Sequence, residues 1–314
     1  MSSIFPKNLI ELSLLFSFSP MVFHGSALAN EPASTKPEKP TVKFYMPEDV
    51  GPMTREDSSS LKNGMSVHRR VISKPKDGSV LMDVGYNSFK AGAGSDKPYA
   101  YSKDELCYVA SGEIYAQSEG KEVFARAGDF MWRPAGAATH QTKVLKDAVT
   151  ICAFAPARDD EWSHRLPQSE IGKWDGDPEK KPHVIFRNYK DVQPMTRPGS
   201  PDYSDGRVVH RRIFTKQRDG AVYIDASHNF YKEGKETGPY SYTHDEVCWL
   251  ESGEIEVTND GVTHIVRTNE FMWRPAGAKT NHAKILKDSV SICFFAPARD
   301  DEWSHIVSAA SGGE

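Results

Sequence analysis

Two glutamates are candidates for chemistry because each lies directly before an apolar run. Glu105 lies in the segment 104–114 (DELCYVASGEI), and Glu246 lies in the similar segment 245–255 (DEVCWLESGEI). A carboxylate buried by such neighbours must be paired, hydrogen-bonded, neutral or metal-bound. Both glutamates are therefore candidate metal ligands or general acid–base groups. The alternative is a carboxylate that accepts a hydrogen bond from an inward-facing tyrosine.

Two pairs of tyrosines precede these glutamates. Tyr99 and Tyr101 come before Glu105, and Tyr240 and Tyr242 occupy the corresponding positions in the second segment. Residues at alternate positions share one face of a strand. An inward face would let the hydroxyls orient a ligand carboxylate or carbonyl, with Tyr101 and Tyr242 as candidates for proton transfer. The alternative is aromatic core packing with locally satisfied hydroxyls.

Two arginines form a third candidate group. Arg133 and Arg274 each follow a tryptophan and precede a Pro-Ala-Gly turn. A guanidinium group here could hold an anionic substrate through two hydrogen bonds. The alternative is a structural salt bridge or aromatic stacking on the outer face.

These candidates occur twice because the chain is a tandem repeat. The segment 130–137 (FMWRPAGA) returns at 271–278, and 155–164 (APARDDEWSH) returns at 296–305. The offset is 142 residues early in the repeat and 141 later, so one residue was lost in between. A period of this length is that of a whole small domain rather than of a solenoid repeat.

The elements that must position these residues are predicted to be strands. Short apolar or alternating runs, such as 106–109 and 149–155, are separated by turn residues such as Asp77-Gly78 and Gly128-Asp129. This pattern favours an antiparallel sandwich or barrel in each copy. Aspartates in the repeated decapeptide predict a capped helical turn that carries a packing tryptophan, Trp162 or Trp303. We assign this decapeptide a structural role.

The motifs resemble those of the cupin superfamily. In the first cupin motif a glutamate precedes a glycine by seven positions, which Glu105 and Gly112 match. In the second motif a glycine precedes Pro-x-Gly, which 128–136 matches, although Asn269 replaces the leading glycine in the second copy. The resemblance covers nearly all of residues 42–305. It implies an all-β chain with two tandem double-stranded β-helix (cupin jelly-roll) domains, each holding any ligand inside its barrel.

The sequence departs from metal-binding cupins at the ligand positions. Those cupins place two histidines shortly before the glutamate, where this chain has the tyrosine pairs, and a third histidine where it has Thr139 and Thr280. The pattern is similar to the ethanolamine-utilisation type of cupin, in which metal binding is not assured. Some relatives with two cupin halves, such as ureidoglycine aminohydrolases, use manganese.

Nearby histidines supply an alternative metal site. His140 and His282 lie just beyond the usual ligand position, and His244 lies two residues before Glu246. His244, Glu246 and His282 would form a two-histidine, one-carboxylate triad, which suits iron or manganese. Glu105 and His140 are the candidate ligands of the first half. The predicted cofactor is one divalent ion (Mn, Fe, Ni or Zn), and His228 is a further candidate ligand.

The four cysteines also repeat. In a cupin jelly roll the strand with the glutamate neighbours the last strand, so Cys107 would face Cys152, and Cys248 would face Cys293. The pairs are either disulfides, as an oxidising compartment allows, or buried free thiols.

Length and composition bound the remaining questions. The chain has 314 residues and a net charge of −4, which disfavours a general nucleic-acid partner. An apolar stretch followed by Ala-Leu-Ala at 27–29 predicts a signal peptide and export to the periplasm or outside the cell, with no membrane span after processing. The predicted divisions are a signal peptide (1–29), a linker (30–41), a first cupin domain (42–166), a linker (167–183), a second cupin domain (184–307) and a tail (308–314).

The favoured function is an exported bicupin that acts on a small polar or anionic metabolite by metal-assisted chemistry. The reaction type stays open among lyase, isomerase, hydrolase and dioxygenase. The alternative is a non-catalytic binding or sensing protein without metal. Jelly-roll edge strands need covering, either by a second chain in a homodimer or by the two halves covering each other.

Overall fold

The computed structural model describes residues 39–55, 58–160, 162, 164–301 and 303–308. The predicted signal peptide and the last residues of the chain lie outside these residues. Residues from Lys39 onward belong to one compact unit, and the fold given below is that of this unit. In the described part of the chain, none of the helices has the length and apolar character needed to cross a membrane.

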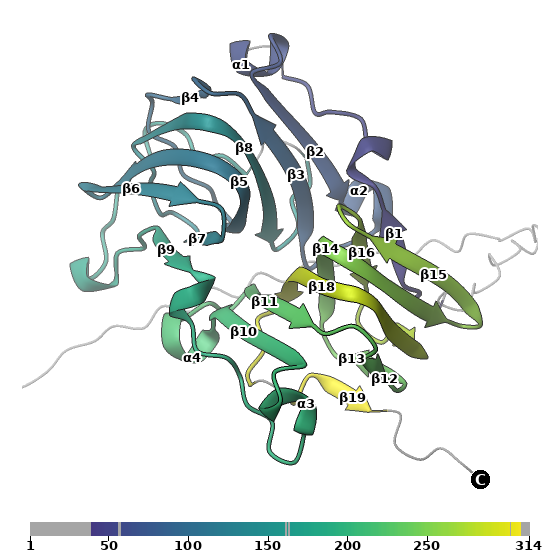
Figure 1. Cartoon of the computed structure of the whole chain (residues 1–314). Coiled ribbons are helices and arrows are strands. Elements are labelled where there is room, and N and C mark those ends of the chain that lie inside the picture. The colour runs from purple at the N-terminus through teal and green to yellow at the C-terminus, as the bar shows by residue number, and fades with distance from the viewer. Residues whose placement is uncertain (1–38, 56–57, 161, 163, 302, 309–314) are drawn as a thin grey trace, which may run out of the picture. The chain divides into compact units, whose positions relative to one another are not determined.

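Strands dominate both copies of the repeat, as Figure 1 shows. The first part of the chain contains β1 (Lys43–Tyr45), η1 (Pro47–Asp49), α1 (Ser59–Lys62), β2 (Ser66–Ile72), α2 (Lys74–Asp77), β3 (Asp83–Phe89), β4 (Gly94–Ser95), β5 (Asp104–Ser118), β6 (Lys121–Arg126), β7 (Asp129–Arg133), β8 (Gln141–Ala155) and η2 (Pro178–Lys180). The second contains β9 (Ile185–Asn188), η3 (Tyr189–Asp191), α3 (Pro201–Ser204), β10 (Val208–Phe214), α4 (Lys216–Asp219), β11 (Asp225–Tyr231), β12 (Glu236–Thr237), β13 (Tyr240–Tyr242), β14 (Asp245–Asn259), β15 (Val262–Arg267), β16 (Phe271–Arg274), β17 (Lys279–Thr280), β18 (His282–Ala296) and β19 (Ile306–Ser308).

The strands form two eight-stranded sheets and a small one. The first sheet runs β2-β3-β8-β5-β7-β9, with β4 beside β8 and β6 beside β5. The second runs β1-β16-β14-β18-β11-β10, with β12 beside β18 and β15 beside β14. The small sheet has the order β17-β13-β19. The predicted all-β class with two tandem jelly-roll domains is confirmed.

The first strand of each copy belongs to the sheet of the other copy. β1 pairs with β16, so that Lys43 faces Trp273, and β9 pairs with β7, so that Ile185 faces Trp132. The boundaries of the sequence repeat therefore differ from those of the sheets. Strand β1, from the predicted first domain, belongs to the second sheet, and β9, from the predicted second domain, belongs to the first sheet. This exchange covers one edge of each sheet, which is where unpaired strands invite association.

Strand β5 shows why both faces of the central sheet are buried. Leu106 and Tyr108 face the main hydrophobic cluster, which also contains Val247 and Trp249 from β14 of the other half. Side chains alternate across a strand, so Glu105 and Cys107 face the opposite way, into the barrel. The apolar run predicted as a strand is thus continuous because one face packs between the halves and the other lines a cavity.

A motif glycine lets β5 bend along β8. The pairing shifts register between Val109 and Ile114. Gly112 lies in this irregular stretch with a φ of 87°, and a Cβ there would come within 2.3 Å of the Asp147 carbonyl oxygen. A residue with a side chain would therefore meet both backbone strain and a clash. Asn269, which replaces the glycine of the second motif, keeps a φ of 76°, as asparagine tolerates better than most residues.

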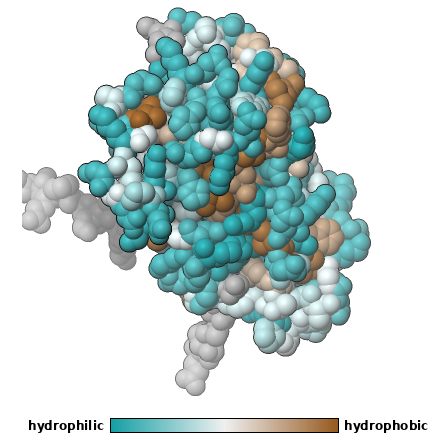
Figure 2. All heavy atoms as spheres, turned by 90° about the vertical axis from the view of Figure 1, so that its left-hand side faces the viewer, coloured by the Kyte–Doolittle hydropathy of each residue, from teal (hydrophilic) through white to brown (hydrophobic). Residues whose placement is uncertain are grey.

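The outer surface is polar on the face turned toward the viewer in Figure 2. Hydrophobic residues form small groups between hydrophilic ones there. Scattered apolar residues of this kind are normal on a protein surface.

Candidate functional site

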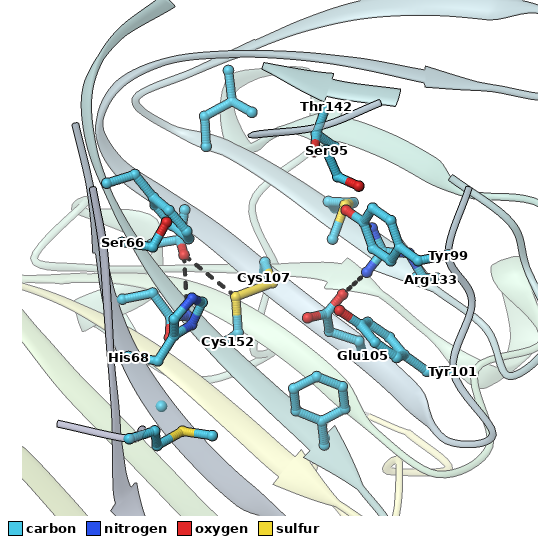
Figure 3. A pocket seen from close by; sticks show the side chains of 18 of the residues that line it. Ser66, His68, Ser95, Tyr99, Tyr101, Glu105, Cys107, Arg133, Thr142 and Cys152 are labelled. Carbon is cyan, nitrogen blue, oxygen red and sulfur yellow. Dashed lines mark hydrogen bonds and ion pairs between the residues drawn. A yellow bond between two sulfur atoms is a disulfide. The ribbon is translucent and has the colours of Figure 1, made fainter. Parts of the chain in front are cut away.

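Each barrel encloses a cavity on the inner side of its central strands. The first cavity has a volume of about 350 Å³ and the second about 340 Å³. Figure 3 shows the first: Glu105, Arg133, Tyr99 and Tyr101 stand on one side, and His68 stands on the other. Cavities of this size accept a small molecule.

The predicted glutamate and arginine form a buried ion pair in each half. Arg133 is the cross-strand neighbour of Glu105, so both side chains face the cavity, and Arg133 Nη1 contacts Glu105 Oε2. The side chain of Arg133 is 2% exposed and that of Glu105 is 8% exposed. Arg274 and Glu246 form the same contact. The structure thus contains the salt bridge that was one alternative for these arginines, but on the inner face of β7 and β16 rather than on the outer face.

Hydrogen bonds hold each arginine in place. Arg133 Nη2 donates to the Tyr99 hydroxyl at 3.2 Å and to Thr139 Oγ1 at 2.9 Å. The guanidinium carbon also lies 4.8 Å from the ring centroid of Tyr99 and 5.1 Å from that of Tyr101, a distance suited to cation–π attraction. The predicted cavity-lining position of the tyrosines is what the structure shows. The alternative from the sequence was a hydrogen bond between a tyrosine and Glu105; the structure instead gives Arg133 as the partner of the Tyr99 hydroxyl.

The second half repeats this arrangement. Arg274 Nη2 donates to the Tyr240 hydroxyl at 3.1 Å, and Arg274 Nε donates to Thr280 Oγ1 at 2.9 Å. The ring centroids of Tyr240 and Tyr242 lie 5.0 and 5.2 Å from the guanidinium carbon. Burial raises the pKa of Tyr242, so its hydroxyl stays protonated at neutral pH.

The structure does not assemble the predicted metal ligands. His282 Nε2 lies 3.4 Å from Glu236, His244 Nδ1 lies 2.7 Å from the hydroxyl of its neighbour Thr243, and His140 Nδ1 accepts a hydrogen bond from the backbone of Glu119 at 3.3 Å. In the described part of the chain, the residues that line the two cavities include none of these three histidines. The predicted two-histidine, one-carboxylate triad is therefore wrong. His244 and His282 are not brought to Glu246, which instead contacts Arg274.

The remaining donors near the glutamates do not fit a resident ion either. A carboxylate oxygen of Glu105 and the sulfurs of Cys107 and Cys152 lie within 4.8 Å of one another, as do the matching atoms in the second half. The cysteines are joined as disulfides, Cys107–Cys152 and Cys248–Cys293. A disulfide sulfur is not the thiolate that metals bind. Of the two alternatives for the cysteine pairs, the structure therefore supports disulfides rather than free thiols.

His228, the further candidate, lies elsewhere in the fold. Its ring stacks on that of Tyr189 with centroids 3.9 Å apart and planes inclined by 4°. Burial lowers the pKa of His228 to about 4. In the described part of the chain, it is not among the residues that line the second cavity.

The cavities contain histidines that the sequence analysis did not select. His164 lines the first cavity, packs against Tyr101 with ring centroids 4.7 Å apart, and is 3% exposed. Burial, assisted by Arg158 and Arg165, lowers the pKa of His164 to about 3. Its Nδ1 has no hydrogen-bond partner among the described residues. His305 is its counterpart, with a pKa lowered to about 3 and the same unpartnered atom.

His68 and His210 face the cavities from the opposite side. His68 Nδ1 lies 2.9 Å from Asn87 Oδ1, and burial lowers the pKa of His68 to about 4. His210 Nδ1 lies 3.1 Å from the hydroxyl of Tyr203, and burial lowers the pKa of His210 to about 3. These rings are neutral at pH 7 and can donate or accept a hydrogen bond.

The decapeptide predicted as a structural helical turn contributes to the cavity lining. Its described residues adopt bends and turns rather than a helix. Arg158, Trp162 and His164 all line the first cavity. Arg158 Nε donates to Asp83 at 2.9 Å and lies over Phe154, with its guanidinium carbon 4.0 Å from the ring centroid. The identity of the two decapeptides was the signal that could have located these residues.

A cation stacks on the tryptophan at each mouth. The guanidinium carbon of Arg55 lies 5.1 Å from the ring centroid of Trp162, and that of Arg197 lies 4.8 Å from the ring centroid of Trp303. Both arginines belong to the repeated Pro-Met-Thr-Arg segment. Aromatic rings and guanidinium groups together therefore frame the entrance to each barrel.

Comparisons with known proteins identify the fold but not the activity. No protein-family model and no curated protein matches the chain. Among solved structures, Ylba from E. coli is 12% identical with a TM-score of 0.58, covering 84% of this chain and 94% of that one. Oxalate decarboxylase from Bacillus subtilis at pH 4.6 is 13% identical with a TM-score of 0.59, covering 87% of this chain and 81% of that one.

A further structure of that oxalate decarboxylase, described for its Mn(II) centers, is 12% identical with a TM-score of 0.57, covering 85% of this chain and 79% of that one. Likeness at such low identity establishes the fold alone. The chain has the bicupin fold: two cupin jelly rolls in tandem.

Proposed function

We propose that each barrel binds a small organic acid and that the protein is an organic-acid-binding protein. The charge of the cavity wall carries this proposal. In the described part of the chain, the lining of the first cavity includes one carboxylate, that of Glu105, which Arg133 already pairs. The same lining includes further arginines: Arg70 and Arg158 pair with Asp83, whereas Arg165 has no carboxylate within ion-pair distance among the described residues.

The chemistry of these groups suits a carboxylate. Guanidinium groups match the two oxygens of a carboxylate, and their attraction for it grows where water is excluded. The neutral ring of His164, with an unpartnered buried nitrogen among the described residues, supplies a further hydrogen-bonding group. The apolar body of a small acid would pack against Tyr101 and Phe154, which also line the cavity.

Binding fits the geometry better than catalysis does. The predicted acid–base group, Glu105, contacts Arg133, and this pairing removes it from proton transfer. His164 and His68 of the first cavity have pKa values of about 3 and 4, which makes them weak bases at neutral pH. The cavity cysteines are disulfide-bonded and supply no thiolate nucleophile.

Metal-assisted chemistry is the second candidate, and the likeness to oxalate decarboxylase favours it. It would require Glu105 or Glu246 to exchange its arginine for an ion. Elemental analysis of the purified protein separates the two candidates, because a resident ion would be present in stoichiometric amount.

Isothermal titration calorimetry tests the proposal. Titration with oxalate, malonate and succinate before and after treatment with a chelator should give the same dissociation constants. Trp162→Ala and Trp303→Ala, at the two mouths, should each weaken binding at one site about tenfold, while Trp174→Ala, an exposed tryptophan, should leave both sites unchanged. Absence of binding by all three acids would refute the proposal, and loss of binding with the metal would replace it with the second candidate.

The proposal includes export. Disulfides are rare in the reducing cytosol, and both cysteine pairs of this chain are disulfide-bonded. Fractionation of the native host followed by N-terminal sequencing should give a mature chain that begins at Asn30. An intact N-terminus in the cytosolic fraction would contradict export.

A further inference from the structure

The two cavities share their inner wall but differ at the mouth. The inner residues correspond one to one: Tyr99 and Tyr240, Glu105 and Glu246, Arg133 and Arg274, His164 and His305. The residue after the decapeptide differs, however, because Arg165 lines the first cavity and Ile306 lines the second. Both lie at the same place in the fold, since the backbone of Arg165 forms an antiparallel β-bridge with Tyr101 and Ile306 pairs with Tyr242 in the small sheet.

Arg165 brings a positive charge to the first cavity. Its guanidinium carbon lies 5.7 Å from the ring centroid of Trp162, 5.9 Å from that of Tyr99 and 6.0 Å from that of Tyr101. Among the described residues, it has no carboxylate within ion-pair distance. Burial lowers the pKa of His68 and His164, and the charge of Arg165 adds to this shift.

The second cavity replaces this charge with uncharged groups. Tyr203 lies where the first copy has Leu61, and Tyr231 lies where it has Phe89, so two phenol groups are added to the lining. Lys235 also lines this cavity, but its amine contacts Asp202 at 2.6 Å. That ion pair offsets the charge of the lysine, and the second mouth gains no net cation from it.

We propose that the barrels bind acids of different charge: the first prefers a dicarboxylate and the second prefers a monocarboxylate, with Arg165 as the residue that discriminates. This inference rests on the proposed function. The physical reason is that a second carboxylate at the mouth would meet the guanidinium group of Arg165 in the first barrel. In the second it would meet Ile306 and be desolvated without a partner.

Succinate and its monoamide, succinamate, test the inference because they differ by one charge at nearly equal size. Calorimetric titration of the full chain should show one site that prefers succinate and one that does not. Arg165→Ile should weaken succinate at the first site about tenfold and change succinamate less than twofold. Ile306→Arg should make the second site prefer succinate.

Two controls accompany the exchange. Arg126→Ile removes an exposed arginine of β6 that pairs with Glu113, and it should leave both affinities unchanged. Arg165→Lys keeps the charge and should keep the preference for succinate. Thermal unfolding of each variant verifies that it is folded.

The outcomes separate the inference from the proposed function. If Arg165→Ile weakens both probes equally, or changes neither while succinate still binds, the inference is overturned and acid binding stands. If the wild-type protein binds neither probe at either site, both the inference and the proposed function are overturned.

Discussion

At the scale of single residues, the two barrels are defined by a buried pair of opposite charges. Arg133 pairs with Glu105. The side chains of Tyr99 and Thr139, at positions where the metal-binding cupins that the chain resembles have histidines, hold that arginine. Removing one partner of a buried pair leaves the other charge uncompensated. Removing either partner alone is therefore expected to destabilise the fold, whatever the net contribution of the intact pair.

Glu105→Gln tests this expectation. We expect the free energy of unfolding to fall by about 3 kcal/mol, because Arg133 would keep its charge without a buried counter-ion. Urea denaturation measures the change. Glu113→Gln is the matched control, since Glu113 pairs with the more exposed Arg126 and Lys146, and it should cost less than about 1 kcal/mol. Equal losses of unfolding free energy in the two variants would show that breaking the buried ion pair costs no more than breaking an exposed one.

The cavity histidines predict a pH dependence of stability. The pKa of His164 is about 3 in the folded protein, below its value in the unfolded chain. The unfolded state thus binds more protons in this range, and the contribution to stability, complete above the unfolded pKa of about 6.5, is lost as pH falls toward 3.

For each such histidine the loss is roughly 1.4 kcal/mol per pH unit below about pH 6. His164→Gln should reduce the slope of unfolding free energy against pH by about this amount, as measured by urea denaturation at about pH 7.5, 6.0 and 5.0. His183→Gln, a change at an exposed position, should leave the slope unchanged. An unaltered slope in His164→Gln would mean that this ring has the same pKa in the folded and unfolded states.

At the scale of elements, the long strands β5 and β14 need a glycine where each crosses its partner. Gly112 and Gly253 both have positive φ, and a Cβ at either would lie under 3.0 Å from the backbone of β8 or β18. The cupin glycine is thus a requirement of close packing as well as of backbone conformation.

Gly112→Ala and Gly120→Ala separate these two requirements. Gly120 has a φ of 75°, but a Cβ at this position would meet nothing within 4 Å. We expect Gly120→Ala to cost about 1 kcal/mol from backbone strain alone, and Gly112→Ala to cost at least twice as much because the strands must also move apart. Denaturation midpoints measure both. Similar midpoints would mean that β8 accommodates the methyl group.

At the scale of the whole described unit, the two halves are joined by exchanged strands and a shared core. A polar contact lies within this core: the Tyr108 hydroxyl donates to Glu251 Oε1 at 2.6 Å. Trp249 and Ala110 occupy the positions related to Tyr108 and Glu251 by the repeat, so this bond has no counterpart among the described residues. Burial raises the pKa of Glu251.

Tyr108→Phe should lower the free energy of unfolding by about 1–3 kcal/mol, because the half-buried Glu251 would lose its donor. The matched control is Tyr115→Phe, which removes a hydroxyl that donates to Glu122 on the surface at 2.9 Å and should cost less than about 1 kcal/mol. Equal unfolding curves for the two variants would show that water replaces the donor between the halves.

The sequence by itself determined the features that depend on local pattern and repetition. Turn residues between short apolar runs predict strands, and the recurrence of Glu105, Gly112 and Arg133 at fixed spacing predicts two copies of one domain. The resemblance to cupins implies that this domain is a jelly roll. Alternate positions also predict that each tyrosine pair shares a strand face; Tyr240 and Tyr242 do lie in β13, whereas Tyr99 and Tyr101 form isolated bridges outside the named strands.

The tertiary structure decided which face was which and which distant groups met. Alternation places Glu105 and Leu106 on opposite faces of β5, but both faces are buried, so burial alone could not show which one lines the cavity. The pairing of Glu105 with Arg133, the position of His164 beside Tyr101 and the exchange of β1 for β9 all join residues far apart in the chain. Such contacts depend on how the sheets close and pack, and the local spacing of residues does not predict them.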